Sequence, residues 1–408
     1  MIRYLKVKIK KLYSIFKKNL FLKNVTKKQF TNDSLKKRAL LYYKTDIFTD
    51  DQLTKKYTHT NNWEVKEIAN QLDSLGFVVD LVDRQHEFFI PKNNYDIFIG
   101  LAGCGSGRFF GKYASRLKKA IKIAYLTTSH PEIMDQCNKL RYEWFHNRTG
   151  ISANRMRIDS SQTYELSNDL KKADYFFLIK DNDSSFSSFS SKSYKKFLNK
   201  KTFFITPSTK PELGFKSSWL ERRDIKSFCC FVGSGFIHKG VDLLVEAFLL
   251  TPNLKLTICG PDSDKAFFKY YKKKIDKNSN IKFEGFINVG SEKFYNIASS
   301  HSFVILYSSS ESCNTSITTM LRVGLVPVIN YETGIDSSEI GFLINEHKND
   351  QNKALDNICY AIRTSSLITK KKYKNLVLKT LKYSDQFTQK SFTKTLKASL
   401  VSVLSKNL

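Results

Sequence analysis

The stretch FVILYSSSESCNTSITTMLRVGLVPVI, residues 303–329, predicts a strand, a polar loop, a helix and a second strand. The apolar run Phe303 to Leu306 is followed by a serine-rich segment, and Gly324 stands where a helix would end. Such a unit places its loop at the carboxyl end of a parallel sheet, where the next helix directs unpaired N–H groups toward a ligand. Because Glu311 lies in that loop, we expect its carboxylate at the ligand-binding edge of the sheet.

The same alternation of apolar runs and helical patterns extends along the chain in two series. The first series places helices at 63–77, 108–119 and 131–148, between strands at 39–43, 78–82, 95–100, 121–126, 173–179 and 202–207. The second series begins near residue 228 and continues to about residue 330. Strands that alternate with helices in this way form parallel βαβ units. We therefore predict an α/β protein made of two Rossmann-like doubly wound domains.

The length of 408 residues is too great for one ordinary core and fits two domains. Proline and glycine mark connecting segments, so Pro207, Pro211 and Gly214 predict a hinge between the two series. The predicted segments are a basic leader, a first Rossmann-like domain, a hinge, a second Rossmann-like domain and a C-terminal helix, with the bounds 1–35, 36–207, 208–225, 226–385 and 386–408.

The leader and the net charge both raise the question of an anionic partner. Residues 2–23 lack acidic side chains and alternate lysine with apolar residues, which predicts a basic amphipathic helix. Such a helix either lies on an anionic membrane leaflet or covers part of the protein as a solvated segment. The net charge of +29 suits nucleic acid, membranes or anionic substrates, but lysines spread along the whole chain also fit a general compositional bias. The sequence holds no nucleic-acid-binding motif, so we do not expect nucleic acid as a partner.

Cysteine usage and hydropathy bear on the compartment. The seven cysteines include no C-x-x-C pair, and Cys229, Cys230 and Cys259 lie beside predicted strands, so we expect buried free thiols and a reducing compartment. No uncharged apolar run approaches the roughly 18 residues that span a bilayer, and lysines interrupt the N-terminal segment too often for a secretory signal. We predict a cytoplasmic protein that the leader can attach to the inner face of a membrane.

A second loop with chemical potential lies in FVGSGFIHKGVDLLVEAF, residues 231–248. It joins a predicted strand to a predicted helix and ends in Lys239-Gly240. Glycines let backbone amides approach an anion, and Lys239 can supply a point charge for a diphosphate. The alternative is a tight turn that carries a solvated lysine.

The order of several motifs in the second half resembles one enzyme family. The motifs are Gly233 with Lys239-Gly240, LTICG at 256–260, IKFEGF at 281–286, Glu311 and GLVPVI at 324–329. This order resembles the retaining glycosyltransferases of the family-4 type (glycosyltransferase group 1), whose two Rossmann domains face each other across a cleft in the GT-B fold. The likeness extends over most of the predicted second domain.

The resemblance implies roles for individual residues. Glu311 would contact the donor sugar, Lys239 would bind the diphosphate, and His130 would match a cleft-facing histidine, which makes these three the catalytic candidates. The implied contacts of the nucleotide sugar are Gly233, Ser234, Lys239, Phe286, Ser312, Asn314, Thr315 and Thr319. A plain alternative for His130 is a cap in front of Pro131 and its helix.

Two positions depart from the family pattern. Ser234 stands where the family has an arginine that binds the diphosphate, and Thr319 stands where it has a glutamate that accepts from the ribose. A hydroxyl at 319 can still hydrogen-bond a ribose, though more weakly than a carboxylate.

The resemblance implies a hexosyltransferase-like enzyme that retains the anomeric configuration. It would move a sugar from a nucleotide-diphosphate sugar, which is a co-substrate, to a hydroxyl of a cell-envelope glycan or lipid-linked saccharide, without a metal or another cofactor. An anionic membrane surface would be a further partner. Because two charged positions are lost, a catalytically silent nucleotide-sugar- or glycan-binding protein on the same scaffold is the alternative.

Two further segments allow other chemistry. Asp181-Asn182-Asp183 has the D-x-D pattern that holds a metal in single-domain glycosyltransferases, but Asp and Asn are also ordinary turn residues. The seven histidines show no ligand spacing, so we predict no metal site. The run GLAGCGSG, residues 100–107, could bind phosphate through its amides or form a flexible loop at the cleft, and we favour the loop.

Overall fold

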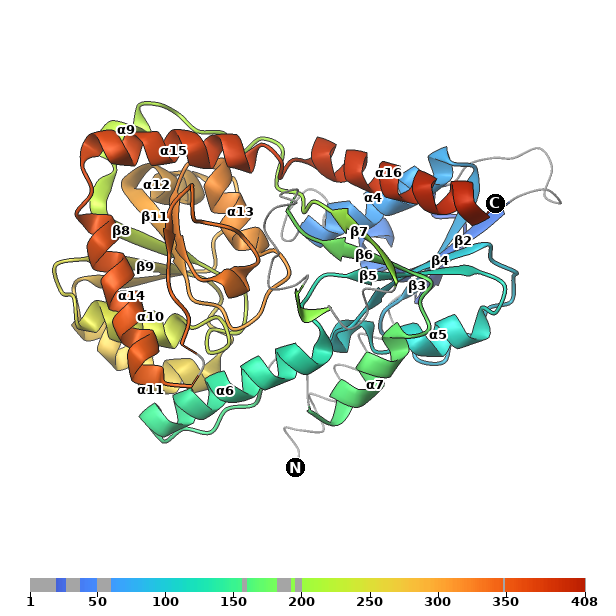
Figure 1. Cartoon of the computed structure of the whole chain (residues 1–408), viewed down its shortest axis with the longest axis horizontal. Coiled ribbons are helices and arrows are strands. Elements are labelled where there is room, and N and C mark those ends of the chain that lie inside the picture. Colours follow the sequence, from blue (N-terminus) through green and yellow to red (C-terminus); the bar gives the residue numbers. More distant parts are fainter. Residues whose placement is uncertain are drawn as a thin grey trace.

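The computed structural model describes residues 20–26, 37–49, 60–155, 160–181, 192–194, 200–347 and 349–407. Two domains lie side by side, each with a twisted sheet covered by helices on both faces (Figure 1). The predicted α/β class with two Rossmann-like domains is confirmed. Residues 206–223 connect the two sheets and include the short helix α9 (Trp219–Arg222).

The first domain has a seven-stranded sheet in the order β1-β3-β2-β4-β5-β6-β7. The strands are β1 (Phe21–Leu22), β2 (Lys37–Tyr43), β3 (Phe77–Asp83), β4 (Ile97–Ala102), β5 (Ile121–Leu126), β6 (Tyr175–Ile179) and β7 (Lys201–Ile205). From β3 to β7 neighbouring strands are parallel. Strand β4 is buried along its whole length, as expected for a central parallel strand that is covered on both faces.

The helices of the first domain are α2 (Asp46–Thr49), α4 (Thr60–Ser74), α5 (Phe110–Arg116), α6 (Pro131–Thr149) and α7 (Ser160–Leu170), with a short 3-10 helix η1 at Gly105–Gly107. Helix α7 was not predicted, because its residues are mostly polar. The helix predicted at 63–77 ends earlier than expected, at Ser74, because the left-handed Gly76 (φ +89°) stops it. Phe77, the last residue of the predicted helix, begins β3.

The predicted leader helix is wrong at its C-terminal end. Residues Phe21 and Leu22 form β1, which pairs antiparallel with Val82 and Leu81 of β3. A short apolar run fits a strand as well as a helix, and here the free edge of β3 supplies hydrogen-bond partners. The folded first domain therefore begins inside the predicted leader, and residues 1–19 lie outside the described residues.

The second domain has a six-stranded parallel sheet in the order β10-β9-β8-β11-β12-β13. Its strands are β8 (Asp224–Phe231), β9 (Lys255–Cys259), β10 (Ile281–Gly285), β11 (His301–Leu306), β12 (Val326–Ile329) and β13 (Phe342–Leu343). Its helices are α10 (Val241–Leu249), α11 (Lys265–Lys277), α12 (Glu292–Ser300), α13 (Thr315–Arg322), α14 (Gln351–Ser366) and α15 (Lys370–Ser384), with the 3-10 helix η3 at Tyr331–Thr333. Cys229, Cys230 and Cys259 are buried free thiols, as predicted.

Both sheets reverse their strand order at one point, between β2 and β4 in the first domain and between β8 and β11 in the second. Open α/β sheets bind ligands at the carboxyl ends of the strands beside such a switch point. Each domain therefore offers one topological position for a ligand.

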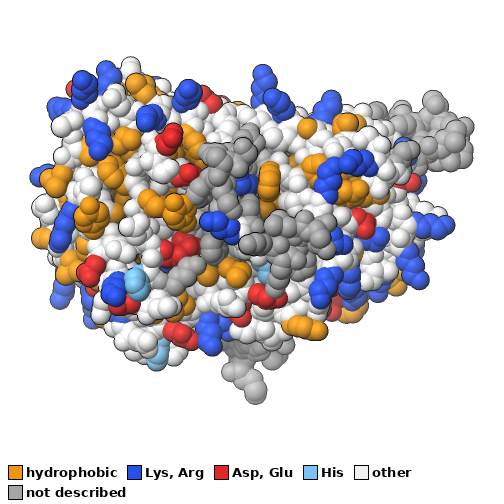
Figure 2. Space-filling view, in the orientation of Figure 1, with side chains coloured by type: hydrophobic (Ala, Val, Ile, Leu, Met, Phe, Trp, Pro, Cys, Tyr) orange, Lys and Arg blue, Asp and Glu red, His pale blue; other side chains and the backbone are white. Residues whose placement is uncertain are grey.

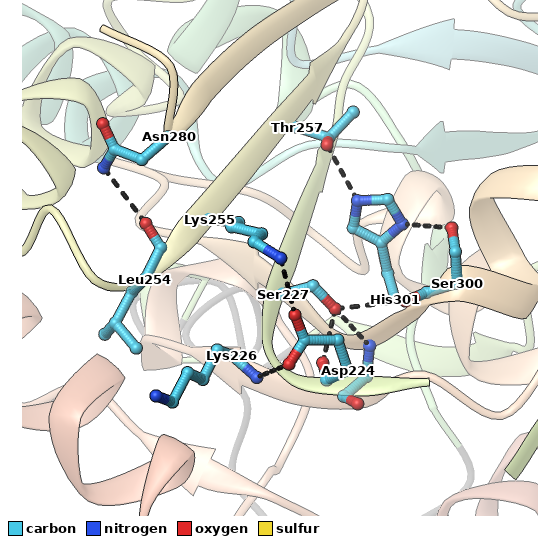
Figure 3. A network of polar contacts seen from close by, with 10 residues as sticks. Asp224, Lys226, Ser227, Leu254, Lys255, Thr257, Asn280, Ser300 and His301 are labelled. Carbon is cyan, nitrogen blue, oxygen red and sulfur yellow. Dashed lines mark hydrogen bonds and ion pairs between the residues drawn. The ribbon is translucent and has the colours of Figure 1, made fainter. Parts of the chain in front are cut away.

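A polar network ties the strands of the second sheet together at the opposite, amino edge (Figure 3). The His301 ring lies 2.8 Å from the Thr257 hydroxyl and 2.9 Å from the Ile297 carbonyl. Lys255 pairs with Asp224 at 3.0 Å. Burial lowers the pKa of His301, so its ring is neutral near pH 7. His301 thus has a structural role far from the ligand-binding edge.

Two helices cross between the domains on opposite sides (Figure 1). Helix α16 (Gln389–Asn407) leaves the second domain and packs on the first, where the Thr393 hydroxyl donates to Glu67 at 2.6 Å. Helix α6 runs from the first domain along the second, where Arg148 forms a buried ion pair with Asp242 and donates to the Tyr271 hydroxyl at 2.9 Å. The two domains are thus held together at both sides of the connection.

Candidate functional site

A pocket lies at the carboxyl edge of the second sheet, beside its switch point. The β8–α10 loop, the ends of β9 and β10 and the start of α13 form its walls, and Thr60 and Lys210 approach from the first domain and the connection. Its lining includes Gly233, Gly260, Phe286, Thr315, Ser316 and Thr319. The pocket therefore occupies the position that the strand order assigns to a ligand.

The pocket wall offers backbone amides to an anion. Apart from Gly233 and its two chain neighbours, no heavy atom of the described chain lies within 4 Å of a Cβ built on this glycine, so the space beside this backbone is open. At α13 the Asn314 side chain accepts from the Ile317 N–H at 3.1 Å and caps the helix. Thr315 and Ser316 follow, in the first turn, where the helix dipole favours negative charge.

A buried charge cluster lies at the same edge of the sheet. Lys239 Nζ lies 3.3 Å from Glu311 Oε1, and each residue is only 6% exposed. The Ser308 hydroxyl donates to the same Glu311 oxygen at 3.3 Å, and His238 Nε2 lies 3.9 Å from it. The alternative of a solvated Lys239 is wrong, because the strand ends enclose the side chain.

Hydrogen bonds fix the loop that carries Glu311. The Glu311 N–H donates to the Glu332 carbonyl at 2.7 Å, and the Ser309 N–H donates to the His238 carbonyl at 2.9 Å. The Asn330 amide donates to the Ser308 carbonyl and to a Glu332 carboxylate oxygen, each at 2.8 Å. The position of the Glu311 carboxylate is therefore set by backbone contacts from both neighbouring loops.

Helix α6 of the first domain covers this cluster. The Arg141 guanidinium lies 4.3 Å from the centre of the Tyr307 ring and donates to the Ser308 carbonyl at 3.2 Å. The Ser309 hydroxyl donates to Asn138 Oδ1 at 3.1 Å. The second-domain edge thus has two parts, an open pocket around Gly233 and a covered cluster around Lys239 and Glu311.

The structure distributes the sequence-predicted residues over these two parts. Gly233, Phe286, Thr315 and Thr319 line the pocket, and Phe286 is 57% exposed. Lys239, Glu311, Ser312 and Asn314 lie on the covered side or at the helix cap, where the Ser312 hydroxyl donates to the Ile179 carbonyl of the first domain. Ser234 is exposed and its hydroxyl accepts from Ser263 at 3.4 Å.

The Thr319 hydroxyl is directed at its own helix. It donates its proton to the Thr315 carbonyl at 2.7 Å, so in this rotamer it can only accept a further hydrogen bond. Its contact with a ribose stays a prediction.

The third catalytic candidate, His130, is fully buried at the start of α6. Its Nδ1 accepts from the Glu132 N–H at 3.3 Å, and its ring meets Tyr194 edge to face at 5.4 Å. The structure thus gives His130 the alternative role of a helix cap, and a contact with substrate stays a prediction.

Sequence reasoning missed Asn138, Arg141 and Lys210. The first two lie on a helix whose pattern carried no sign of an interdomain contact. Lys210 stands beside Pro211 in the predicted hinge, and a lysine between two facing domains was a signal that could have been used.

The segment 100–107 is not the flexible loop that we favoured. It contains η1, and a Cβ on Gly107 would lie 2.5 Å from the Leu101 carbonyl oxygen, so the turn is closely packed. The D-x-D segment is described only at Asp181, whose buried carboxylate pairs with Lys180 at 3.0 Å and accepts from Tyr383 at 2.7 Å. In the part of the chain that the structure describes, no group of three or more His, Cys, Asp or Glu side chains could hold a metal ion.

Comparisons with known proteins agree with this architecture. Residues 216–358 match the family described as glycosyl transferases group 1. A search of curated proteins returned no match. Sucrose-phosphate synthase from Thermosynechococcus elongatus superposes with a TM-score of 0.63 at 12% identity, over 91% of this chain and 100% of that one.

Two further solved structures have the same arrangement. WaaG, a glycosyltransferase involved in lipopolysaccharide biosynthesis, superposes with a TM-score of 0.51 at 12% identity, over 89% of this chain and 98% of that one. The pneumococcal O-GlcNAc transferase GtfA, in complex with UDP and GlcNAc, gives 0.50 at 16% identity, over 76% of this chain and 57% of that one. At such identities the likeness shows the fold. The chain therefore has the GT-B fold, and residues 216–358, which make up most of its second domain, match the family of glycosyl transferases group 1.

Proposed function

We propose that this protein transfers a sugar from a nucleotide-diphosphate sugar to a hydroxyl group of an acceptor. The observation that carries the proposal is the open pocket at the second switch point, whose neighbouring loops hold the buried pair Lys239 and Glu311. The group 1 match over residues 216–358 supports the same reaction.

In this proposal the nucleotide lies in the pocket. Phe286 and Thr319, which line the pocket, would contact the base and ribose, and the amides after Gly233 and at the start of α13 would bind the diphosphate. Charge develops on the diphosphate as the glycosidic bond breaks, and donors that are already fixed stabilise such charge without reorganisation. Lys239 supplies the full positive charge for this step.

Glu311 has the role of positioning the donor sugar. A carboxylate accepts hydrogen bonds from sugar hydroxyls, and a charged acceptor in an enclosed site binds them more strongly than a neutral one. In the structure described above, here called the closed arrangement, Glu311 is paired with Lys239 and covered by α6. We propose that the sugar enters when α6 separates from the Ser308–Ser309 segment, which exposes both charged groups.

The finer parts of the proposal concern the acceptor and the chemistry. We propose a cell-envelope glycan or a lipid-linked saccharide as the acceptor. We also propose that the reaction retains the anomeric configuration and needs no metal, because Lys239 and backbone amides stabilise the negative charge of the diphosphate. WaaG, which has the same fold, acts in lipopolysaccharide biosynthesis. We also propose a cytoplasmic protein that contacts the inner face of a membrane. Within the described residues, no helix is long and apolar enough to cross a membrane.

A silent binding protein is the second candidate. Ser234 and Thr319 replace two charged groups of the family pattern, and Lys239 and Glu311 neutralise each other in the closed arrangement. Such a protein would hold a nucleotide sugar without breaking its glycosidic bond.

Release of nucleoside diphosphate from a panel of UDP-, GDP- and ADP-sugars separates the two candidates. The full-length chain and the control Glu339→Gln, which changes an exposed carboxylate of the same domain, should release nucleotide. Glu311→Gln should lose about two orders of magnitude in rate, the usual cost of one fixed polar group in a transition state. Calorimetric binding without release by the parent would favour the silent protein, and absence of binding would contradict both candidates.

A further inference from the structure

The loop between β3 and β4 exposes two large apolar side chains. Phe88 is 76% exposed and Ile90 is 66% exposed. Phe89, which lies between them, is buried and packs against Phe21 of β1 at 4.8 Å and Tyr113 of α5 at 5.8 Å. The buried ring anchors the loop, so that the apolar side chains on either side of it are held outward.

Basic side chains from the α5 segment surround this loop. Lys112 and Arg116 are four residues apart on α5 and so share one helical face, and Arg108 lies two residues before the helix begins. The Lys112 ammonium lies 5.2 Å from the centre of the Phe88 ring, and Arg116 donates to the Phe89 carbonyl. Figure 2 shows Lys and Arg side chains on the part of the first domain that carries α5.

The chain enters the first domain beside the same loop. Phe21, the first residue of β1, contacts Phe89, and the 19 residues that precede Leu20 carry seven Lys or Arg and no acidic side chain. The basic leader therefore joins the domain next to Phe88 and Ile90, whatever path its own residues take.

We propose that the surface formed by Phe88, Ile90, Arg108, Lys112 and Arg116, here called the docking surface, binds an anionic phospholipid bilayer. Two exposed apolar side chains beside a set of cations match the surface of such a bilayer, where anionic headgroups lie above an apolar interior. The exposed aliphatic side chain of Ile90 would gain nothing from a soluble polyanion, which has no apolar interior. The docking surface does not depend on the proposed sugar transfer.

The position of the docking surface gives it a use. Its loop leaves the carboxyl end of β3, and α6, which reaches the second domain, leaves the carboxyl end of the parallel strand β5. The bilayer would therefore meet the domain that supplies α6 to the candidate site, and a lipid-linked acceptor would be held near that domain.

Vesicle sedimentation of the full-length protein tests the proposal. Phe88→Ser with Ile90→Ser is compared with a matched control, Tyr360→Ser with Leu367→Ser, which removes two exposed apolar side chains from the second domain. The vesicles are phosphatidylcholine with and without phosphatidylglycerol. Burial of each apolar side chain contributes about a factor of ten to binding, so the docking variant, which loses two, should bind anionic vesicles about a hundredfold more weakly than the parent. The control should bind like the parent.

Hydrogen exchange with the same vesicles separates the docking surface from the leader. Anionic vesicles should protect residues 84–92 of the parent. Equal binding by the docking variant and the parent, or no protection at 84–92, would overturn the proposal. Equally strong binding to vesicles of phosphatidylcholine alone would also overturn it, because the cations would then have no role.

Discussion

The sheets of the two domains each have a switch point, but the packing around these two points differs. In the second domain the space beside Gly233 is open in the described structure, and the pocket begins there. In the first domain the corresponding turn is closed, because Gly107 lies against the Leu101 carbonyl and Gly111 lies against the Asp169 carboxylate. Topology therefore provides a position for a ligand, and local packing decides whether that position is open.

The two domains also differ in the partners of their buried carboxylates. In the first domain the buried Glu64 accepts hydrogen bonds from the Ser208 hydroxyl at 3.0 Å and the Ser208 N–H at 3.2 Å, so it holds the connection in place. In the second domain the buried Glu311 faces Lys239. One buried carboxylate is used for structure, and the other belongs to a cluster that a ligand could rearrange.

The largest effect should come from breaking the ion pair between the domains. Arg148→Met leaves Asp242 buried without its main cation, and removal of one partner of a buried pair costs about 3–5 kcal/mol. Urea unfolding measures the loss. The double variant Arg148→Met with Asp242→Asn should recover part of it, and no recovery would mean that Arg148 acts through packing alone.

The pH dependence of Arg148→Met has a definite sign. Burial already raises the pKa of Asp242 above its ordinary value, and loss of the arginine charge raises it further. The folded state then binds a proton more readily than the unfolded state, so the variant's deficit in stability should shrink as the pH falls from 7 toward the ordinary carboxyl value of 3.8. A deficit that grows on acidification would contradict this account of the pair.

Alanine substitutions at the two glycines test the comparison directly. Gly107→Ala places a Cβ 2.5 Å from a backbone oxygen and should cost about 1–3 kcal/mol of unfolding free energy. Gly233→Ala meets open space and should change it by less than about 0.5 kcal/mol. Similar losses from both substitutions would mean that the two turns are packed alike.

Loss of Lys239 should affect both stability and ligand binding. Lys239→Met leaves the buried Glu311 without its nearest cation, which should cost about 1–3 kcal/mol of unfolding free energy. It should also weaken nucleoside-diphosphate binding about tenfold in calorimetry, since a hydrogen bond to a charged group contributes about 1.5–3 kcal/mol. Lys265→Met, at an exposed position of the same domain, is the control. Unchanged nucleotide affinity in Lys239→Met would remove this residue from the ligand site.

The smallest effect should come from restoring a carboxylate in the pocket. Thr319→Glu should tighten nucleoside-diphosphate binding by about 0.5–1.5 kcal/mol if a ribose lies beside α13. Thr319→Gln has nearly the same size without the charge, so it isolates the electrostatic part. Equal affinities for the two variants would place the ribose elsewhere.

The sequence predicted what local patterns control. Alternating apolar runs predicted both sheets, and the loops before Lys239 and after Leu306 were correctly placed at a strand end. It did not predict the cover over Glu311, because Asn138 and Arg141 reach it only through the packing of one domain on the other. Nor did it distinguish the open Gly233 from the closed Gly107, since both stand in glycine-containing turns after apolar strands and differ only in what surrounds them.

Hydrogen exchange of the full-length protein with nucleoside diphosphates tests the central claim most directly. The measurement compares each peptide with and without saturating uridine, guanosine or adenosine diphosphate. If the open switch point is the ligand site, at least one of the three should protect residues 231–240, 285–290 and 311–319, while residues 100–111 exchange as before. Protection of 100–111 instead, or no protection by any of the three nucleotides, would contradict the account.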